Sequence, residues 1–159
     1  MRIASILSLI LFSLLAFGCG PKLLPGLGIE LKDTPDHRAL LQVLDSFAQA
    51  YEQKDIDGLV GLASKNFFET SGSTETDDDY GYDGLRKHFA EHFKMVEKIK
   101  LEMQLKDVEV TEDQATVDYR YVTRYLMKLP SGDKWKLTDD VNRMKLAREE
   151  GQWKILSGM

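Results

Sequence analysis

Two histidines four residues apart are the first feature of this sequence that could do chemistry. His88 and His92 enclose Glu91 in the order H-x-x-E-H, which places two imidazoles on one side of a helix, as some zinc sites require. Such a site also needs a third ligand from elsewhere, and the short pattern arises easily on a helix rich in Lys, Glu and His. We therefore expect no metal and no other cofactor. His92 falls inside the apolar stripe of its helix and is predicted to face a pocket or the core.

Tyrosines at alternate positions form a second candidate site. Tyr119, Tyr121 and Tyr125 share one side of the longest strand that the sequence predicts, because alternate residues of a strand point to the same face. Tyr51 is expected to project towards them from a helix. A mostly apolar cavity with a few polar groups is typical of a small-molecule site. These four tyrosines and His92 are therefore predicted to line a ligand pocket.

One acidic residue could give such a pocket a general base. Asp139 has the same parity as Trp135 and Leu137, which are expected to be buried, so its carboxyl group is predicted to point inward as well. Burial would raise the pKa of this carboxyl group and suit it to proton abstraction. Alternatively, the tyrosines are ordinary core residues and a bulge turns Asp139 to solvent. The absence of a legible acid–base pair favours this second interpretation.

The C-terminal part of the chain is expected to form the sheet that positions these residues. Apolar residues alternate from Ile99 to Leu105, as in a strand with one buried face. The parity changes at Val108, which predicts a bulge. The next strand, over residues 115–129, exceeds the usual length of about 5–6 residues, so it must twist and curl around a core.

The strand that follows is harder to interpret. Residues 130–133, Pro-Ser-Gly-Asp, predict a turn. Trp135 and Leu137 then open a strand that Met144 continues with the opposite parity. If all three are buried, the strand must contain an irregularity, which is expected near residues 139–142.

Residues 34–96 are expected to supply helices that cover this sheet. Thr34 is a predicted N-cap, followed by Pro and Asp in the first turn. Asp55 is predicted to cap a shorter helix over residues 56–64, and a third helix is expected over residues 85–96. Helices segregated from an antiparallel sheet define the α+β class.

Four short runs in this order resemble a known superfamily. Residues 47–51 (Phe-Ala-Gln-Ala-Tyr) and 54–59 (Lys-Asp-Ile-Asp-Gly-Leu) are similar to the opening signature of the nuclear-transport-factor-two-like, or SnoaL-like, superfamily. Residues 84–86 (Gly-Leu-Arg) and 151–155 (Gly-Gln-Trp-Lys-Ile) resemble its later landmarks. The resemblance covers most of residues 36–157 and implies a cone-shaped, curved antiparallel sheet packed on N-terminal helices, with a pocket at the open end.

The resemblance implies no single activity, because members include isomerases, dehydratases, cyclases and non-catalytic binding or scaffold domains. The enzymes among them use an Asp or His in the cone as general base, and the matching candidates here are Asp139 and His92. We expect a non-catalytic small-molecule-binding or accessory domain. The alternative is an isomerase- or dehydratase-type enzyme that uses one of these two residues.

The N-terminal segment indicates secretion. Arg2 precedes an uncharged, mostly apolar run over residues 3–17, which is shorter than the ~20 residues of a membrane-spanning helix and typical of a signal peptide. The run ends Leu-Leu-Ala-Phe-Gly-Cys and resembles the lipobox of bacterial lipoproteins. That resemblance implies acylation of Cys19, and Gly20 after it implies the outer membrane of the cell envelope.

The predicted organisation is therefore a signal peptide over residues 1–18, a lipid-anchored tether over 19–33 and a single domain over 34–159. The tether is unusually apolar, so part of it is expected to pack against the domain. The alternative is that it docks to a partner. Its large apolar residues are Leu23, Leu24, Leu27, Ile29 and Leu31.

The net charge and the surface pattern limit the classes of partner that this chain can have. The formal net charge of −5 argues against nucleic acid and against electrostatic adhesion to anionic lipid. A single cysteine excludes an internal disulfide bond. On the predicted outer face of the sheet, Arg120 and Arg124 argue against a large apolar patch, whereas Val122 and Leu126 leave room for a homodimer contact.

Overall fold

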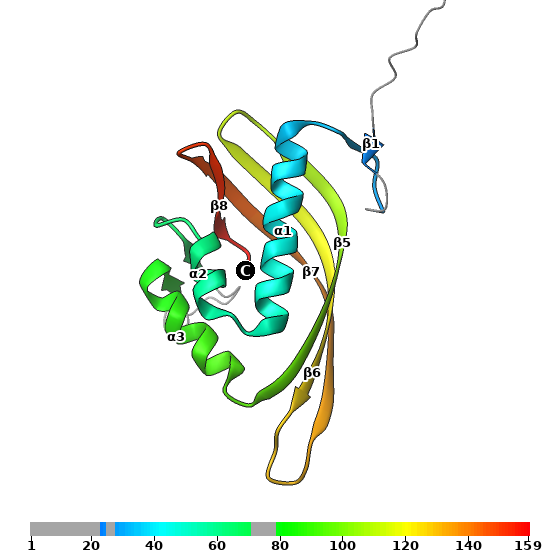
Figure 1. Ribbon diagram of the computed structural model, residues 1–159, viewed down its shortest axis with the longest axis vertical. Coiled ribbons are helices and arrows are strands. Elements are labelled where there is room, and N and C mark those ends of the chain that lie inside the picture. Colours follow the sequence, from blue (N-terminus) through cyan, green and yellow to red (C-terminus); the bar gives the residue numbers. More distant parts are fainter. Residues whose placement is uncertain (1–22, 25–27, 71–78) are drawn as a thin grey trace, which may run out of the picture.

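The computed structural model describes residues 23–24, 28–70 and 79–159 of the 159-residue chain. In it, a long antiparallel sheet curves around helix α1, with two further helices beside α1 (Figure 1). The helices are α1 (Pro35–Gln53), α2 (Ile56–Leu62) and α3 (Tyr82–Phe93). The sheet strands, in spatial order, are β5 (Val96–Val110), β6 (Gln114–Met127), β7 (Lys134–Glu149) and β8 (Gln152–Ser157).

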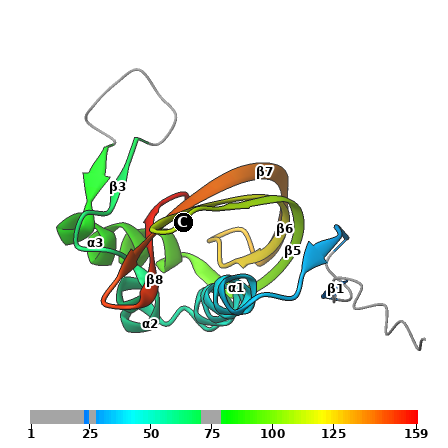
Figure 2. The same cartoon turned by 90° about the horizontal axis from the view of Figure 1, so that it is seen from above.

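Two short hairpins complete the fold. They pair β1 (Leu23–Leu24) with β2 (Leu31–Lys32) and β3 (Phe68–Glu69) with β4 (Tyr80–Gly81). Seen from above, the four-stranded sheet bends over α1 and encloses it on one side (Figure 2). The predicted α+β class and the curved sheet packed on N-terminal helices are confirmed.

The helix starts follow the predicted caps. The Thr34 hydroxyl accepts a hydrogen bond from the backbone N–H of His37 at 3.1 Å, and the Asp55 carboxylate accepts one from the N–H of Gly58 at 3.0 Å. Both satisfy an N–H that has no partner within its helix. The predicted end of the third helix is wrong: α3 stops at Phe93, and Val96 opens β5. Val96 continues the helical spacing of apolar residues, but it belongs to β5, and its side chain is buried there.

The core lies between the helices and the concave face of the sheet. Val117, Met144 and Ile155 on three neighbouring strands have no exposed surface, and Leu40 and Leu59 reach them from the helices. Removing such side chains from water is the main source of stability in a domain of this size.

The predicted tether contributes to this core as well. Leu31 is 5% exposed, and Ile29 packs against the core. Part of the tether therefore packs against the domain, as expected. Residues 1–18 and Cys19, which carry the predicted signal peptide and lipid attachment, lie outside the described residues. Within the described part of the chain, no helix combines the length and the apolar character needed to cross a membrane.

The strand pairing confirms one predicted irregularity and corrects another. The register of β5 on β6 shifts between Leu105 and Asp107, where the change of parity predicts a bulge. In contrast, β6 and β7 pair without a break from Gln114–Ala147 to Met127–Lys134. The irregularity expected near residues 139–142 is therefore absent from this pair of strands.

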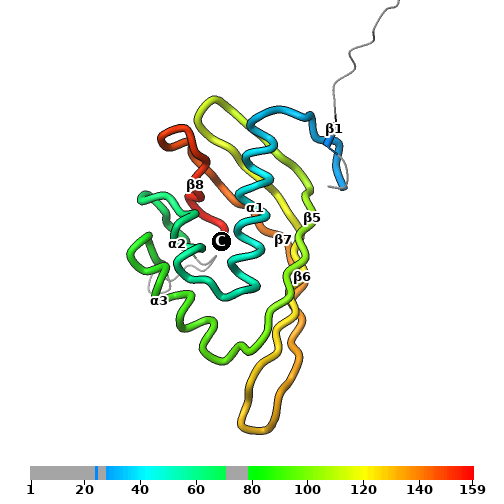
Figure 3. The backbone as a smooth tube through the Cα atoms, viewed as in Figure 1, coloured from blue at the N-terminus to red at the C-terminus, as the bar shows by residue number. Residues whose placement is uncertain are grey.

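The unbroken register places Trp135 and Leu137 on the outer face. They lie opposite Leu126 and Arg124, and each is 61% exposed. The prediction that they are buried is wrong, because one parity holds along the whole of β7 and its buried set is the one that contains Met144. The backbone ladder decides which side chains enter the core, whatever their hydrophobicity. Figure 3 shows the path of β6 and β7 and the hairpin that joins them.

Candidate ligand pocket

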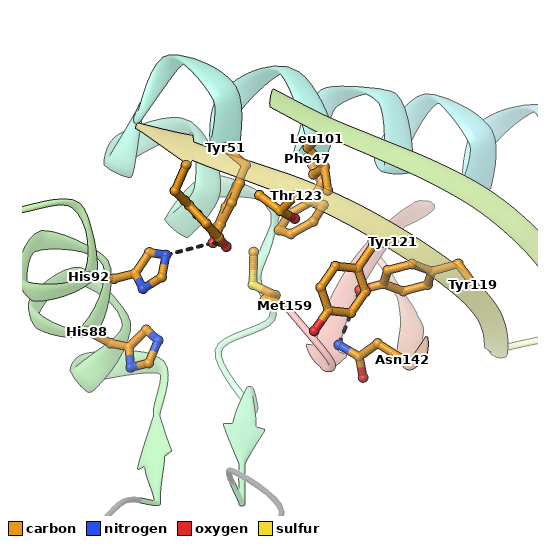
Figure 4. A pocket seen from close by; sticks show the side chains of 11 residues that line it. Phe47, Tyr51, His88, His92, Leu101, Tyr119, Tyr121, Thr123, Asn142 and Met159 are labelled. Carbon is orange, nitrogen blue, oxygen red and sulfur yellow. Dashed lines mark hydrogen bonds between the residues drawn. The ribbon is translucent and has the colours of Figure 1, made fainter. Parts of the chain in front are cut away.

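A cavity of about 250 Å³ opens between α1, α3 and the concave face of β6 (Figure 4). Its walls are mostly aromatic or apolar, with hydroxyl, imidazole and amide groups spaced along them. The lining residues are Phe47, Tyr51, His88, His92, Leu101, Tyr119, Tyr121, Thr123, Tyr125, Asn142 and Met159.

The periodicity of three elements brings these side chains together. Alternate residues of β6 supply three tyrosines and Thr123 to one face. Phe47 and Tyr51 lie one turn apart on α1, and His88 and His92 lie one turn apart on α3. Three segments that are far apart in the sequence therefore meet at one cavity, as the predicted cone requires.

A hydrogen-bonded cluster joins the three elements on the wall of the pocket. The hydroxyl of Tyr51 lies 2.8 Å from Nε2 of His92 and 3.0 Å from the hydroxyl of Tyr125. Figure 4 shows the Tyr51–His92 contact as a dashed line between α1 and α3. The ring of Tyr51 also packs edge-on against Phe93, with centroids 5.4 Å apart. Tyr51 is thus held at both its ring and its hydroxyl.

A second polar cluster lies at the other end of the tyrosine row. The buried Tyr119 hydroxyl donates to the carbonyl oxygen of Gly158 at 3.0 Å, and the Asn142 side-chain amide donates to that hydroxyl at 3.3 Å. The backbone N–H of Gly158 in turn donates to the Glu69 carboxylate at 2.6 Å. These contacts fix the last residues of the chain beside the pocket, where Met159 forms part of the wall.

The tyrosines act as neutral groups in this setting. Burial is the main cause that raises the pKa of Tyr51, and hydrogen bonding to Tyr125 raises it further. Burial likewise raises the pKa of Tyr119. Both phenols therefore stay protonated at neutral pH. The proton of Tyr119 is already donated to Gly158, so the Tyr51–Tyr125 pair is the one that can offer a hydrogen bond to a ligand.

The two histidines are also held neutral. Burial lowers the pKa of His92, and repulsion from Lys136, and from His88 once that ring is protonated, lowers it further. Burial lowers the pKa of His88, although Glu69 and Glu91 oppose this effect. The His88 ring stacks on Tyr80 with centroids 4.2 Å apart. Among the described residues, no three or more His, Cys, Asp or Glu side chains lie together as a metal site would require.

These pKa directions predict a pH-dependent stability. The free energy of unfolding is expected to fall as the pH drops from about 7.5 to about 5, because unfolded histidines titrate near 6.5 and the folded ones only at lower pH. Between those values the unfolded chain binds more protons, so acid favours unfolding. Groups facing His92 from each side are Tyr51, His88, Tyr125 and Lys136.

Urea denaturation at several pH values measures this slope. A variant in which both His88 and His92 are replaced by Gln should show a flatter dependence over the same range, while His37 stays in place as an internal control. Equal slopes for the two proteins would contradict the assignment of these histidines as the titrating groups.

Asp139 does not belong to the pocket, and its predicted inward orientation is wrong. Its carboxylate is 43% exposed on the outer face of β7, where the guanidinium of Arg120 donates to it with an N–O distance of 2.8 Å. Asp139 shares parity with Trp135 and Leu137, as the sequence shows, but that parity faces outward. The general-base candidate Asp139 is therefore excluded by its orientation.

The other predicted residues meet at one cavity. Tyr51, His92, Tyr119, Tyr121 and Tyr125 all line it. Sequence reasoning missed several further lining residues, although two signals were available: Thr123 has the parity of the tyrosines, and His88 lies one turn before His92. Asn142 and Met159 carry no such signal, because their places depend on the β6–β7 register and on the path of the chain after β8. The missed residues are Phe47, His88, Leu101, Thr123, Asn142 and Met159.

The helices, the bent antiparallel sheet and the cavity between them together define a cone-shaped α+β domain. The family model of the SnoaL-like domain matches residues 40–158. The chain therefore belongs to the SnoaL-like family, whose fold is nuclear-transport-factor-two-like. A search of curated proteins finds no match.

Solved structures share this fold at low sequence identity. A ketosteroid isomerase-like protein from Erwinia carotovora atroseptica is 14% identical, with a TM-score of 0.66 over 79% of this chain and 94% of that one. A putative scytalone dehydratase from Novosphingobium aromaticivorans is 13% identical, with a TM-score of 0.67 over 77% and 80%. A hexachlorocyclohexane dehydrochlorinase is 15% identical, with a TM-score of 0.64 over 77% and 82%. At these identities the similarity establishes the fold alone.

Proposed function

We propose that the cone of this domain binds a small, mostly apolar ring compound without transforming it. The observation that carries the proposal is the composition of the pocket wall. Among the described residues that line it there is no Asp or Glu, and the imidazole of His92 is hydrogen-bonded to the phenol of Tyr51. An imidazole that acts as catalytic base is usually oriented by a carboxylate or another acceptor. Here the hydroxyl, imidazole and amide groups of the wall are suited to hydrogen-bonding a ligand.

The size of the cavity limits the ligand. A volume of about 250 Å³ is just below the ~300–1,000 Å³ of typical ligand sites, so one or two fused rings fit best. Aromatic walls offer stacking and edge-on contacts, and the phenols of Tyr51 and Tyr125 offer hydrogen bonds to a hydroxyl or carbonyl group.

Calorimetric titration with 2-naphthol, a two-ring probe with one hydroxyl group, tests the proposal. The expected result is one site per chain with a dissociation constant below about 1 mM, because burying two rings outweighs the loss of ligand freedom. Cyclododecanol, whose puckered ring has no flat face to stack on the aromatic walls, should bind more weakly. Absence of heat with 2-naphthol and with other two-ring alcohols would overturn the proposal.

A second candidate function is proton abstraction by His92, as in an isomerase or dehydratase. One observation favours it: burial and nearby positive charge keep His92 unprotonated at neutral pH, which a general base requires. The SnoaL-like family includes such enzymes as well as binding proteins.

The two functions predict different rates of hydrogen exchange in a substrate-like probe. An enzyme should accelerate exchange of the acidic α-hydrogens of 2-tetralone into D₂O, as seen by NMR, whereas a binding domain should not.

The predicted cell-envelope location is a separate proposal. It is supported by the apolar leader over residues 3–17 and by the lipobox-like residues that end at Cys19. More than one acyl chain gives stable membrane anchoring, so acylated Cys19 would hold the domain at the envelope, with the outer membrane as the proposed site. Mass spectrometry of protein extracted from membranes should show an acylated N-terminal cysteine. An unmodified Cys19, or cleavage elsewhere, would overturn this proposal.

We also propose a homodimer through the outer face of β6 and β7. Trp135, Leu137 and Val141 are 61–68% exposed on this face, and the adjacent charges are already paired within the chain, as in Arg120–Asp139. The paired charges next to these three side chains are poorly suited to an acidic or basic partner, whereas a second copy related by a two-fold axis presents the same apolar groups. Sedimentation equilibrium should give twice the chain mass. A monomer at high concentration would contradict this proposal.

A further inference from the structure

The concave face of β7 extends the pocket wall onto an open strand edge. Strand β8 pairs only with Lys145–Glu149 of β7, so in the described structure the preceding part of β7 has no paired strand on that side. Paired residues of antiparallel strands point to the same face. In the β6–β7 register, the four concave-face residues of this edge lie beside the tyrosine row, and we name them the β7 ledge. They are Lys136 beside Tyr125, Thr138 beside Thr123, Asp140 beside Tyr121 and Asn142 beside Tyr119.

The ledge carries one charge of each sign, and the two are kept apart. Lys136 and Asp140 are four residues apart on an extended strand, which separates their Cα atoms by roughly 13 Å. Within the described chain neither side chain forms an ion pair. Both are exposed. The outer face of the same strand differs, because Asp139 and Arg143 are each paired there.

Lys136 stands at the end of the ledge where hydrogen-bond donors converge. It is paired with Tyr125, whose hydroxyl contacts Tyr51, which in turn contacts His92. The charge of Lys136 is close enough to His92 to lower the pKa of that imidazole. Two phenols and one imidazole therefore lie together on the cavity wall, where no described lining residue is a carboxylate. The ammonium group of Lys136 is outside this lining, on the exposed strand edge next to Tyr125.

We propose that the ligand of this pocket is an acid, a small ring compound whose carboxylate is held by Lys136 beside His92 and Tyr125. This inference rests on the proposed binding function and adds the chemical class of the ligand. An ammonium group and protonated phenols form charge-assisted hydrogen bonds with a carboxylate. Asp140, at the Tyr121 end, repels the same carboxylate and so sets the orientation of the ligand, with its ring towards Leu101 and Met159.

A pair of probes that differ only in charge tests the inference. The probes are 2-naphthoate and its neutral methyl ester, titrated by calorimetry into the wild-type protein and two variants. Lys136→Met removes the charge at the ledge. Lys145→Met removes the same charge from the exposed outer face of the same strand and serves as the matched control.

The wild-type protein and the Lys145→Met variant should bind 2-naphthoate more tightly than the ester. In the Lys136→Met variant the affinity for 2-naphthoate should fall about twofold to fivefold, the range for an exposed charge pair, while the affinity for the ester stays unchanged. Equal binding of 2-naphthoate by wild-type protein and the Lys136→Met variant, with the ester still bound, would overturn the inference and leave the proposed function intact. If neither probe binds the wild-type protein, the proposed function fails and this inference fails with it.

Discussion

The Tyr51→Phe variant is expected to bind 2-naphthol about tenfold or more weakly than the wild-type protein and to lose about 1–3 kcal/mol of unfolding free energy. The hydroxyl of Tyr51 is the only group in the described structure that joins His92 to Tyr125 through hydrogen bonds. Without it, the exposed imidazole of His92 and the buried phenol of Tyr125 lose their shared partner in the pocket. The ring remains, so the change isolates the hydroxyl group.

Tyr82→Phe is the matched control for this variant. Tyr82 is the first residue of α3, outside the pocket wall, and its ring lies 3.8 Å from the ammonium group of Lys65. This variant should bind 2-naphthol as the wild-type protein does. Calorimetry and urea denaturation measure both quantities. Equal affinity in all three proteins would show that the Tyr51 hydroxyl takes no part in binding.

The Ile155→Ala variant is expected to lose about 2–5 kcal/mol of unfolding free energy, the range for removing a large aliphatic side chain from a packed core. Ile155 has no exposed surface and pairs with Leu146 of β7. Its carbonyl oxygen accepts a hydrogen bond from the N–H of Ser64 at 2.8 Å, just after α2. The residue therefore links the helices to the last strand of the sheet, and a cavity there cannot be filled without moving both.

Leu137→Ala is the control on the opposite face of the sheet. Leu137 is 61% exposed on β7 of the single chain, so at a protein concentration too low for dimer formation its truncation should change the unfolding free energy by about 0.5 kcal/mol or less. Urea denaturation of both variants tests the assignment of inner and outer faces. A loss at Leu137 as large as that at Ile155 would contradict it.

The elements with strong local signals could be predicted from the sequence. Helix α1 begins after Thr34 as its capping pattern indicates, and β6 follows from the alternation around Tyr119 and Tyr125. Both patterns repeat the periodicity of their element over many residues. The bulge after Leu105 could also be predicted, because an extra residue in one strand is what moves the buried set from one parity to the other.

Strand β7 could not be predicted in the same way, because its two faces carry conflicting signals. Trp135 and Leu137 indicate one buried face and Met144 indicates the other. The outcome depends on the hydrogen-bonded register with β6, which is a property of two strands at once. The same register places Asp139 outside the pocket and Lys136 beside it, so one error in parity changed the candidate site in two places.

The candidate site was predictable where it depends on periodicity within one element. Tyr51, His92 and the three tyrosines of β6 each lie on the buried side of a helix or strand. Asn142 and Met159 enter the pocket through strand pairing and through the path of the chain after β8, and neither can be inferred from local spacing. This difference explains why the aromatic wall was predicted and the amide-bearing end was missed.

The central claim is that ligand enters the cone formed by Tyr51, His92 and the β6 tyrosines. An NMR titration of 2-naphthol into protein with labelled methionine methyl groups and tryptophan indoles tests it most directly. Met159 lines the cavity, whereas the indole of Trp135 lies on the outer face. The expected result is a saturating shift of the Met159 methyl signal, with the Trp135 indole signal unchanged. A shift at Trp135 with none at Met159 would contradict the claim.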